Sequence, residues 1–200
     1  MTTSGHNPDI FAADSFADRT FQGVVLPEGD LRHKEFSDCI FTKCELNGCD
    51  LSGALFVDCN FNNCDLSNIK VNGCGFRSCV FNGCKLVGVV FSTVNPLLLN
   101  WDFTKCKIAL CKFSDLSLKR SRFTECVIQG TEFIKVDMTA ADFSGSDLQN
   151  STFDGVNLEK AIFLGAWNYY IDPTRNKLKQ ARFSYPEALS LLAPFGVKIE

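Results

Sequence analysis

The sequence contains few of the residues on which catalytic and metal centres are usually built. Its 200 residues include only two histidines, His6 and His33, and neither stands at a recognisable spacing from a nucleophile. Most of its 14 glycines follow a five-residue period, and they do not cluster in a phosphate-binding loop. The sequence therefore predicts a protein without catalytic residues, metal or cofactor.

Long hydrophobic runs and linkers are also missing. No stretch of about 18 consecutive apolar residues occurs, and no basic patch precedes an apolar run at the N-terminus, so neither a membrane span nor a signal peptide is expected. No segment rich in proline, glycine and serine divides the chain. These absences favour a single cytoplasmic domain.

What the sequence has in abundance is a large apolar residue at every fifth position. These centres run from Phe11 to Phe91 in 17 pentads and resume in a shifted register from Leu98 to Phe163 in 14 more. Of the 19 phenylalanines, 17 are centres. A period of five fits neither a helix nor simple strand alternation, because successive centres would point to different sides of either element. Each pentad must therefore contain a turn.

Glycine and asparagine occupy the position at which that turn is expected. Ten of the 14 glycines lie two residues after a centre, and the same position holds Asn63, Asn68, Asn100 and Asn150. Both residue types tolerate the positive φ angles of tight corners.

A second period sets the size of the coil. Between Phe16 and Leu86 the centres repeat as Phe, Phe, Leu, then Leu or Val, every four pentads. Four pentads then form one coil with four corners, and like residues stack from coil to coil. Nearly eight such coils predict a rod roughly 37 Å long at the spacing of neighbouring strands.

All eleven cysteines stand two residues before a centre, as Cys39 precedes Phe41. This placement indicates small side chains that face inward. Cysteines 20 residues apart would stack at about 4.8 Å, within the range for a disulfide, but parallel side-chain directions disfavour a bridge. Their C-x4-C spacing is not that of a zinc ribbon. Buried, reduced thiols agree with the cytoplasm, and a thiol-based metal or redox protein remains an alternative that requires accessible cysteines.

Several pentads read as a small residue, then Asp, then Leu or Phe. The clearest are Cys49-Asp50-Leu51, Cys64-Asp65-Leu66, Ala141-Asp142-Phe143 and Ser146-Asp147-Leu148. Through these motifs the sequence resembles the pentapeptide-repeat family over residues 9–183. The resemblance implies an all-β fold, a right-handed quadrilateral β-helix also called a pentapeptide-repeat solenoid.

The regular spacing is interrupted between Phe91 and Leu98. Residues 92–98 add two positions to one pentad and include Pro96, which has no N–H to donate to a strand ladder. We expect a bulge there, with Leu97 and Leu99 facing solvent or a partner. Two interpretations stay open: a recognition loop that includes Asn95 and Pro96, or a tolerated insertion that separates two stacks.

The N-terminal end departs from the pattern in a different way. Its inward positions hold charged residues, namely Asp9, Asp14, Arg19 and Lys34. Because charges are costly in a dry core, the first coil is expected to be frayed or to act as a polar cap. Residues 1–8 are expected to be a disordered tail.

The C-terminal end loses the pattern after Phe163 and recovers it at Ala181 and Phe183. Ser184 and Glu187 have the spacing of a capping box, which predicts a short C-terminal helix from about Pro186 to Leu192 that stops at Pro194. Residues 195–199 alternate like a strand. Residues 184–200 would therefore form a tail that covers the end of the solenoid.

That tail carries more apolar residues than one thin helix needs to cap a coil, which suggests homodimerisation. The residues expected to dimerise or to cap are Leu189, Leu191, Leu192, Phe195, Val197 and Ile199. The tail is similar to that of the Qnr/MfpA-like group of pentapeptide-repeat proteins. This resemblance implies end-to-end dimers that protect DNA gyrase and topoisomerase IV from quinolones and other poisons, and that mimic B-DNA.

The charge pattern supports such mimicry only in patches. The net charge is −3, and residues 28–65 and 125–161 each carry −5, whereas residues 66–122 carry +7. A DNA mimic needs dense negative charge, and no face of the predicted rod is strongly acidic. Candidate acidic contacts near the dimer end are Asp137, Asp142, Asp147, Asp154 and Glu159. The basic band lacks exposed aromatic residues, so direct nucleic-acid binding is not expected.

The leading hypothesis is a non-catalytic, dimeric protein that binds a type II topoisomerase and protects it from quinolone or peptide poisons. The alternative is an interaction scaffold for a different protein partner. A solvated, mixed surface without a binding role would explain the charges equally well.

Overall fold

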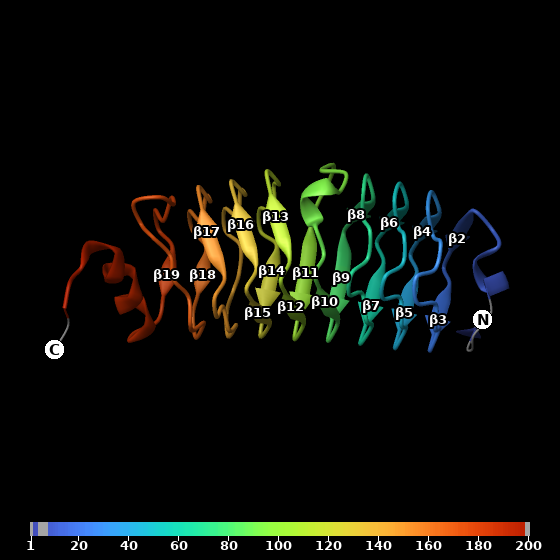
Figure 1. Ribbon diagram of the computed structural model, residues 1–200, viewed down its shortest axis with the longest axis horizontal. Coiled ribbons are helices and arrows are strands. Elements are labelled where there is room, and N and C mark those ends of the chain that lie inside the picture. The colour runs from blue at the N-terminus through green and yellow to red at the C-terminus, as the bar shows by residue number, and fades with distance from the viewer. Residues whose placement is uncertain (1, 4–7, 199–200) are drawn as a thin grey trace.

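The computed structural model describes residues 2–3 and 8–198, and it shows a rod of about eight stacked coils with the two ends of the chain at opposite ends (Figure 1). Each coil has four sides, and strands on each side pair in parallel with those of the neighbouring coils. The predicted quadrilateral β-helix with one short C-terminal helix is confirmed. No helix in the described residues is long and apolar enough to cross a membrane.

The chain visits the four sides in a fixed order, which we number as faces one to four. The first face carries β2 (Ser15–Ala17), β4 (Glu35–Ser37), β6 (Leu55–Val57) and β8 (Gly75–Arg77). The third face carries β10 (Lys85–Val87), β12 (Lys107–Ala109) and β15 (Val127–Gln129). The fourth face carries β13 (Lys112–Ser114), β16 (Glu132–Ile134) and β17 (Thr152–Asp154). Short bridges between residues 20 apart continue these faces along the rod.

The second face is the longest. It carries β1 (Thr2–Thr3), β3 (Thr20–Gln22), β5 (Ile40–Thr42), β7 (Asn60–Asn62), β9 (Cys79–Asn82), β11 (Trp101–Thr104), β14 (Arg122–Thr124), β18 (Ile162–Phe163) and β19 (Arg182–Phe183). Bridges at Asp142 join β14 to β18. Of the predicted disordered tail, residues 1 and 4–7 lie outside the described part. Expected disorder at residues 2–3 and 8 is wrong, because β1 pairs with β3 and a 3₁₀ helix, η1, spans Pro8–Phe11.

Stacked phenylalanine rings fill the core. On the second face an unbroken column of rings has centroid separations of 4.7 to 5.1 Å, and it comprises Phe21, Phe41, Phe61, Phe81, Phe103, Phe123, Phe143, Phe163 and Phe183. These separations match the spacing of neighbouring strands, because each ring sits directly above its equivalent in the next coil. The predicted 20-residue stacking is therefore confirmed.

The turn two residues after almost every centre adopts a left-handed backbone conformation, as the glycine and asparagine pattern predicts. At Gly83 the φ angle is +63°, and an added Cβ would collide with the amide oxygen of Asn63 in the coil before it. The same conformation occurs at bulkier residues, including Leu110 with φ 53°. Corner geometry is therefore imposed by the coil and is not limited to residues that favour it.

The insertion replaces the first-face strand of one coil. A 3₁₀ helix, η2 (Phe91–Thr93), leads into it, and Leu99 then forms an antiparallel bridge to Arg77 in an otherwise parallel assembly. Leu98 is not a centre as predicted: its side chain is 68% exposed and its φ is 59°. The expectation that Leu99 faces outward is also wrong, because its side chain is only 8% exposed and joins the core.

Trp101 supplies the core volume that the missing first-face centre would have provided. It lies in register with Cys79, at a position that holds a small residue in the other coils from Cys39 onward. The Trp101 indole Nε1–H donates to the Phe76 carbonyl oxygen at 2.8 Å. Its ring meets those of Phe76, Phe91, Phe103 and Phe113 at centroid separations of 6.1, 5.3, 6.0 and 6.4 Å.

The aromatic columns change faces at this insertion. Before it, phenylalanines stack on the first face up to Phe76. After it, they stack on the fourth face from Phe91 to Phe153. Trp101 touches the end of one column and the start of the other. The insertion therefore joins two stacks whose cores have different arrangements.

The C-terminal helix differs in detail from the prediction. The helix η3 (Glu187–Phe195) is a 3₁₀ helix that continues through Pro194 and ends at Gly196, whose φ is 67°. Ser184 does not cap it, because the Ser184 hydroxyl oxygen instead accepts the Gly165 N–H at 2.8 Å. Phe195 belongs to the helix, so the predicted strand over residues 195–199 is wrong for the described residues. Proline in a short, exposed 3₁₀ helix removes one backbone donor, which that helix tolerates.

Candidate interaction surfaces

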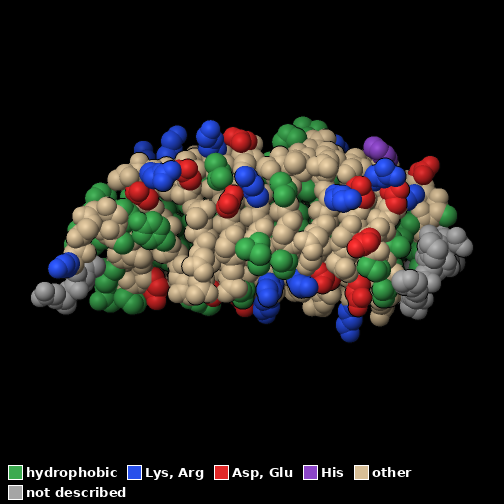
Figure 2. Space-filling view, in the orientation of Figure 1, with side chains coloured by type: hydrophobic (Ala, Val, Ile, Leu, Met, Phe, Trp, Pro, Cys, Tyr) green, Lys and Arg blue, Asp and Glu red, His purple; other side chains and the backbone are tan. Residues whose placement is uncertain are grey.

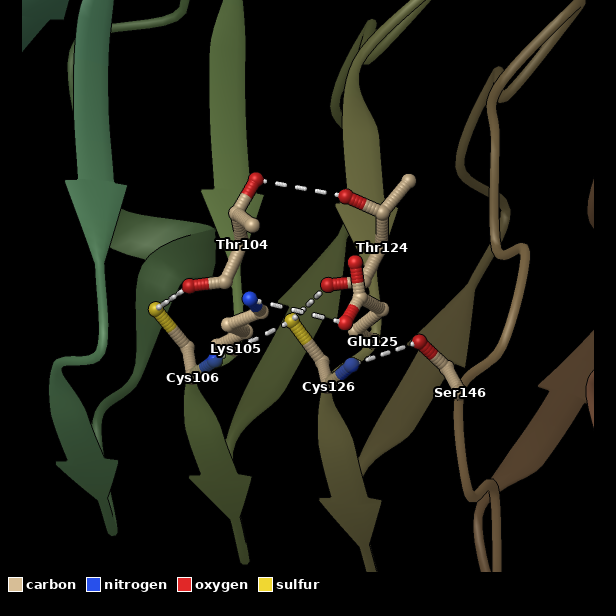
Figure 3. A network of polar contacts seen from close by, with 7 residues as sticks. All are labelled: Thr104, Lys105, Cys106, Thr124, Glu125, Cys126 and Ser146. Atoms are coloured by element: carbon tan, nitrogen blue, oxygen red, sulfur yellow. Dashed lines mark hydrogen bonds and ion pairs between the residues drawn. The ribbon is translucent and has the colours of Figure 1, made fainter.

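The cysteines belong to the packing of the rod. All eleven are unbridged and buried. In Figure 3, Cys106, Cys126 and Ser146 occupy the same position in three successive coils. The Cys126 N–H donates to Ser146 Oγ at 2.8 Å, and the Ser146 hydroxyl donates to the Phe123 carbonyl oxygen at 2.6 Å. Each small inward side chain of this kind links two coils, so it contributes hydrogen bonds as well as small size.

Burial makes these thiols unreactive. Loss of hydration raises the pKa of Cys59 to about 12 and that of Cys49 to about 11. The same cause raises the pKa of Cys111 to about 11. Because the thiolate is the reactive form, these residues do not act as nucleophiles near neutral pH. Among the described residues, no group of three or more His, Cys, Asp and Glu is arranged to hold a metal ion.

The candidate acidic contacts do not form one strip. Strand bridges place Asp142 on the second face, Asp147 on the third and Asp137 on the first, while Asp154 ends β17 on the fourth. Glu159 follows Leu158 on the first face, where the backbone carbonyl oxygen of Glu159 accepts the Ala140 N–H. Two of these acids are also neutralised, Asp137 by Lys119 at 3.3 Å and Asp154 by Arg175 at 2.7 Å. These five acids therefore do not make one continuous acidic surface near the C-terminus.

The basic band is largely matched by acids in adjacent coils. Five of its nine cations form ion pairs, namely Lys85 with Asp65, Lys105 with Glu125, Lys112 with Glu132, Lys119 with Asp137 and Arg122 with Asp102. Figure 2 shows Lys and Arg interspersed with Asp and Glu over the visible face. The +7 of residues 66–122 therefore does not appear as one basic surface.

The insertion forms an apolar projection. Leu97 is 54% exposed and Leu98 is 68% exposed. Figure 2 shows a hydrophobic hump at the top of the rod, where Figure 1 places the insertion. Asn95 is committed to the fold, because its N–H donates to the Cys74 carbonyl oxygen at 2.9 Å and its Oδ1 accepts the Leu97 N–H at 3.0 Å. Of the residues predicted here, Pro96 and Leu97 are exposed, Asn95 is half-buried and Leu99 is buried.

A second apolar surface lies at the C-terminal end. Leu192, Phe195 and Val197 are 39%, 57% and 51% exposed. Leu191 packs partly against the core, and Leu189 is half-buried. Ile199 lies outside the described residues. The sequence did not single out Trp167, Tyr170 and Tyr185, which add exposed aromatic surface at the same end.

The corner between the first and second faces separates charge by sign along the rod. Its residues in successive coils are Asp18, Asp38, Asp58, Ser78, Asn100, Arg120, Ala140, Lys160 and Gln180. In the described part of the chain, none of these charged side chains forms an ion pair. Counting by pentads did not reveal this column, because its members are 20 or 22 residues apart and the overall charge is balanced.

Comparisons with known proteins identify this type of rod. The family model described as "Pentapeptide repeat region" matches residues 14–91, 54–133 and 95–163. Among curated proteins, no sequence matches the chain significantly.

Two solved structures of trypsin-treated variants of QnrB1, described as a plasmid-mediated fluoroquinolone resistance protein, are similar in fold. One variant shares 19% identity and a TM-score of 0.67, over 93% of this chain and 90% of that one. The other variant shares 18% identity and a TM-score of 0.68, over 100% of this chain and 98% of that one.

Proposed function

This chain belongs to the pentapeptide-repeat family, and on that premise we propose that it is a non-catalytic cytoplasmic protein that binds a type II topoisomerase and protects it from quinolone or peptide poisons. The observation that carries the proposal is its similarity in fold to QnrB1 over 93% of this chain and 90% of that one. Both the apolar insertion and the C-terminal apolar surface offer positions for a protein partner.

The corner aspartates supply the element of DNA mimicry that fits the geometry best. Asp18, Asp38 and Asp58 are exposed and stand one coil apart, which is about 4.8 Å. One strand of duplex DNA carries one charge per ~3.4 Å of helix axis, so the density of charge along this short column is comparable. Partial mimicry of DNA therefore fits the N-terminal corner better than the scattered C-terminal acids.

We propose that the C-terminal surface forms a homodimer. The exposed parts of Leu192, Phe195 and Val197 lie next to one another in sequence at the end of the rod, and a second copy would remove them from water. Burying apolar surface of this kind contributes about 25 cal/mol per Å². At about 500 mM NaCl, changing Phe195 to Asp should therefore reduce the dimer to a monomer in sedimentation experiments, with the solenoid's circular dichroism unchanged.

The decisive experiment is DNA supercoiling by gyrase with ciprofloxacin and increasing amounts of the full chain. Protection would restore supercoiling and lower the yield of cleaved DNA complexes. A triple change of Asp18, Asp38 and Asp58 to Asn should weaken protection, whereas the change of Asp142 and Asp147 to Asn provides a control with two of the scattered acids. If supercoiling and cleavage both stay unchanged at micromolar protein, the topoisomerase proposal is wrong and a different protein partner is favoured.

A further inference from the structure

We propose that the corner between the first and second faces is a self-recognition surface, through which two copies associate side by side in antiparallel orientation. The column at this corner is acidic toward the N-terminus, with Asp18, Asp38 and Asp58. Toward the C-terminus it is basic, with Arg120 and Lys160. Two copies related by a two-fold axis place the acidic half of one against the basic half of the other.

The register of the coils makes this arrangement self-complementary about Asn100. Stacked rings such as Phe41 and Phe61 set the repeat at 4.8 Å, so Asp38 and Lys160 each lie three coils, or about 14 Å, from Asn100. A two-fold axis at Asn100 therefore brings Asp38 of one copy opposite Lys160 of the other. Asp58 falls opposite Ala140, whose methyl group leaves space for the longer side chains of Arg120 and Lys160.

The basic half of the corner is hollowed. An open hollow is lined by Asn100, Lys119, Arg120, Thr139, Ala140 and Lys160. Lys119 already forms an ion pair with Asp137. In the described part of the hollow, Arg120 and Lys160 have no such partner and are available to bind a carboxylate of another molecule. A carboxylate from a second copy would be held there by charge-assisted hydrogen bonds.

The insertion adds apolar contact at the centre of the same surface. Leu97 and Leu98 precede Asn100 closely in the chain and are 54% and 68% exposed. On the proposed axis, the leucines of the two copies lie close to each other, where they are shielded from water. Charges therefore set the orientation and register, while the leucines contribute the hydrophobic free energy.

The predicted association is weak. The corner residues lie about 4.8 Å apart along the rod, and the edge that they form is roughly 12 Å wide. Contact along this edge would bury ~900 Å² of surface on the two copies together, which is less than the ~1,200 Å² of stable interfaces. Its dissociation constant is expected in the micromolar range and should rise with ionic strength, because exposed charges are screened by salt. Association of two copies would cover the corner aspartates. This association does not depend on whether the protein binds a topoisomerase.

Paired charge reversals test the register directly. Asp38→Lys places a lysine opposite Lys160, and Lys160→Asp places an aspartate opposite Asp38, so each variant alone should dimerise about tenfold more weakly than the parent. In an equimolar mixture both contacts become favourable again, because each variant supplies the charge that the other lacks. All proteins carry Phe195→Asp, which removes the apolar contact proposed for the C-terminal dimer.

Sedimentation velocity at about 50 mM NaCl, where screening is weak, is the readout. The expected result is a dimer for the parent and the mixture, monomers for each variant alone, and loss of the mixed dimer at about 500 mM NaCl. The same mixture with Leu98→Glu in both chains should remain monomeric. The proposal is overturned if the mixture stays monomeric without Leu98→Glu, if either variant alone associates as well as the parent, or if the mixture forms open-ended polymers.

Discussion

Mild alkali should unfold this protein, because folding raises the pKa of many thiols, through hydrogen bonds between neighbouring thiols at some positions and through loss of hydration at others. A buried thiol whose pKa is raised favours the protonated form in the folded state, whereas the same thiol ionises near its ordinary pKa of 9.0 once the chain unfolds. The stabilising difference is therefore fully present below about pH 9 and is lost as the pH rises from there toward the folded pKa.

The magnitude follows from the six thiols with raised pKa values near 11 or 12, namely Cys49, Cys59, Cys64, Cys84, Cys106 and Cys111. At about pH 10 each has lost about one pKa unit of stabilisation, or ~1.4 kcal/mol. Together they remove roughly 8 kcal/mol. Since a folded domain has about 5 to 15 kcal/mol of total stability, the midpoint of alkaline unfolding should lie near pH 10.

Urea unfolding followed by circular dichroism at about pH 7.5, 9 and 10, with a reductant under nitrogen, measures this loss. Replacing Cys49 and Cys111 by serine provides the matched control, because serine keeps a hydroxyl for the hydrogen bonds to Leu26 and Leu86 but does not ionise. The double variant should lose about 3 kcal/mol less than the parent at about pH 10. A parent whose free energy of unfolding changes by less than about 1 kcal/mol between about pH 7.5 and 10 would refute the reasoning.

Three further predictions concern single side chains and are checked by urea unfolding at neutral pH. Ser146→Ala leaves the buried Cys126 N–H without its acceptor and should cost about 2 kcal/mol, whereas Ser146→Cys should cost less than half of that. Trp101→Phe loses the bond to the Phe76 carbonyl and should cost about 1 to 2 kcal/mol, and Trp101→Ala about 3 to 5 kcal/mol. Leu110→Asn should stabilise by about 0.5 to 1 kcal/mol, because the exposed leucine has a φ of 53° that asparagine tolerates better; a loss of stability would contradict this account of the corners.

The sequence predicts the repeating parts of this molecule well, because each pentad experiences the same environment. One large inward residue, one small inward residue and one left-handed corner recur, and Cys39, Phe41 and Lys43 illustrate all three. The hydrogen bonds of the small residues were less accessible from sequence. Cysteine, serine and threonine at that position share a donor and an acceptor, which a classification by size alone does not detect.

Prediction fails where the environment stops repeating. Counting by five assigned Leu98 to the core, whereas Leu99 and Trp101 fill the space that the insertion leaves. A tryptophan at a position of small residues could be understood only once the neighbouring first-face centre was found to be missing. The candidate acids failed for a related reason, since residues near one another in sequence are turned to different faces by each corner.

The junction at Trp101 has a consequence for how this rod could be altered or could have arisen. Coils on one side of it share a core pattern with phenylalanine on the first and second faces, and coils on the other side share a pattern with phenylalanine on the second and fourth. Duplicating or deleting one 20-residue unit within either block keeps every ring above its equivalent. Moving a unit from one block to the other would place aromatic rings above aliphatic side chains, so Trp101 marks the boundary between two modules that can lengthen independently but cannot exchange parts.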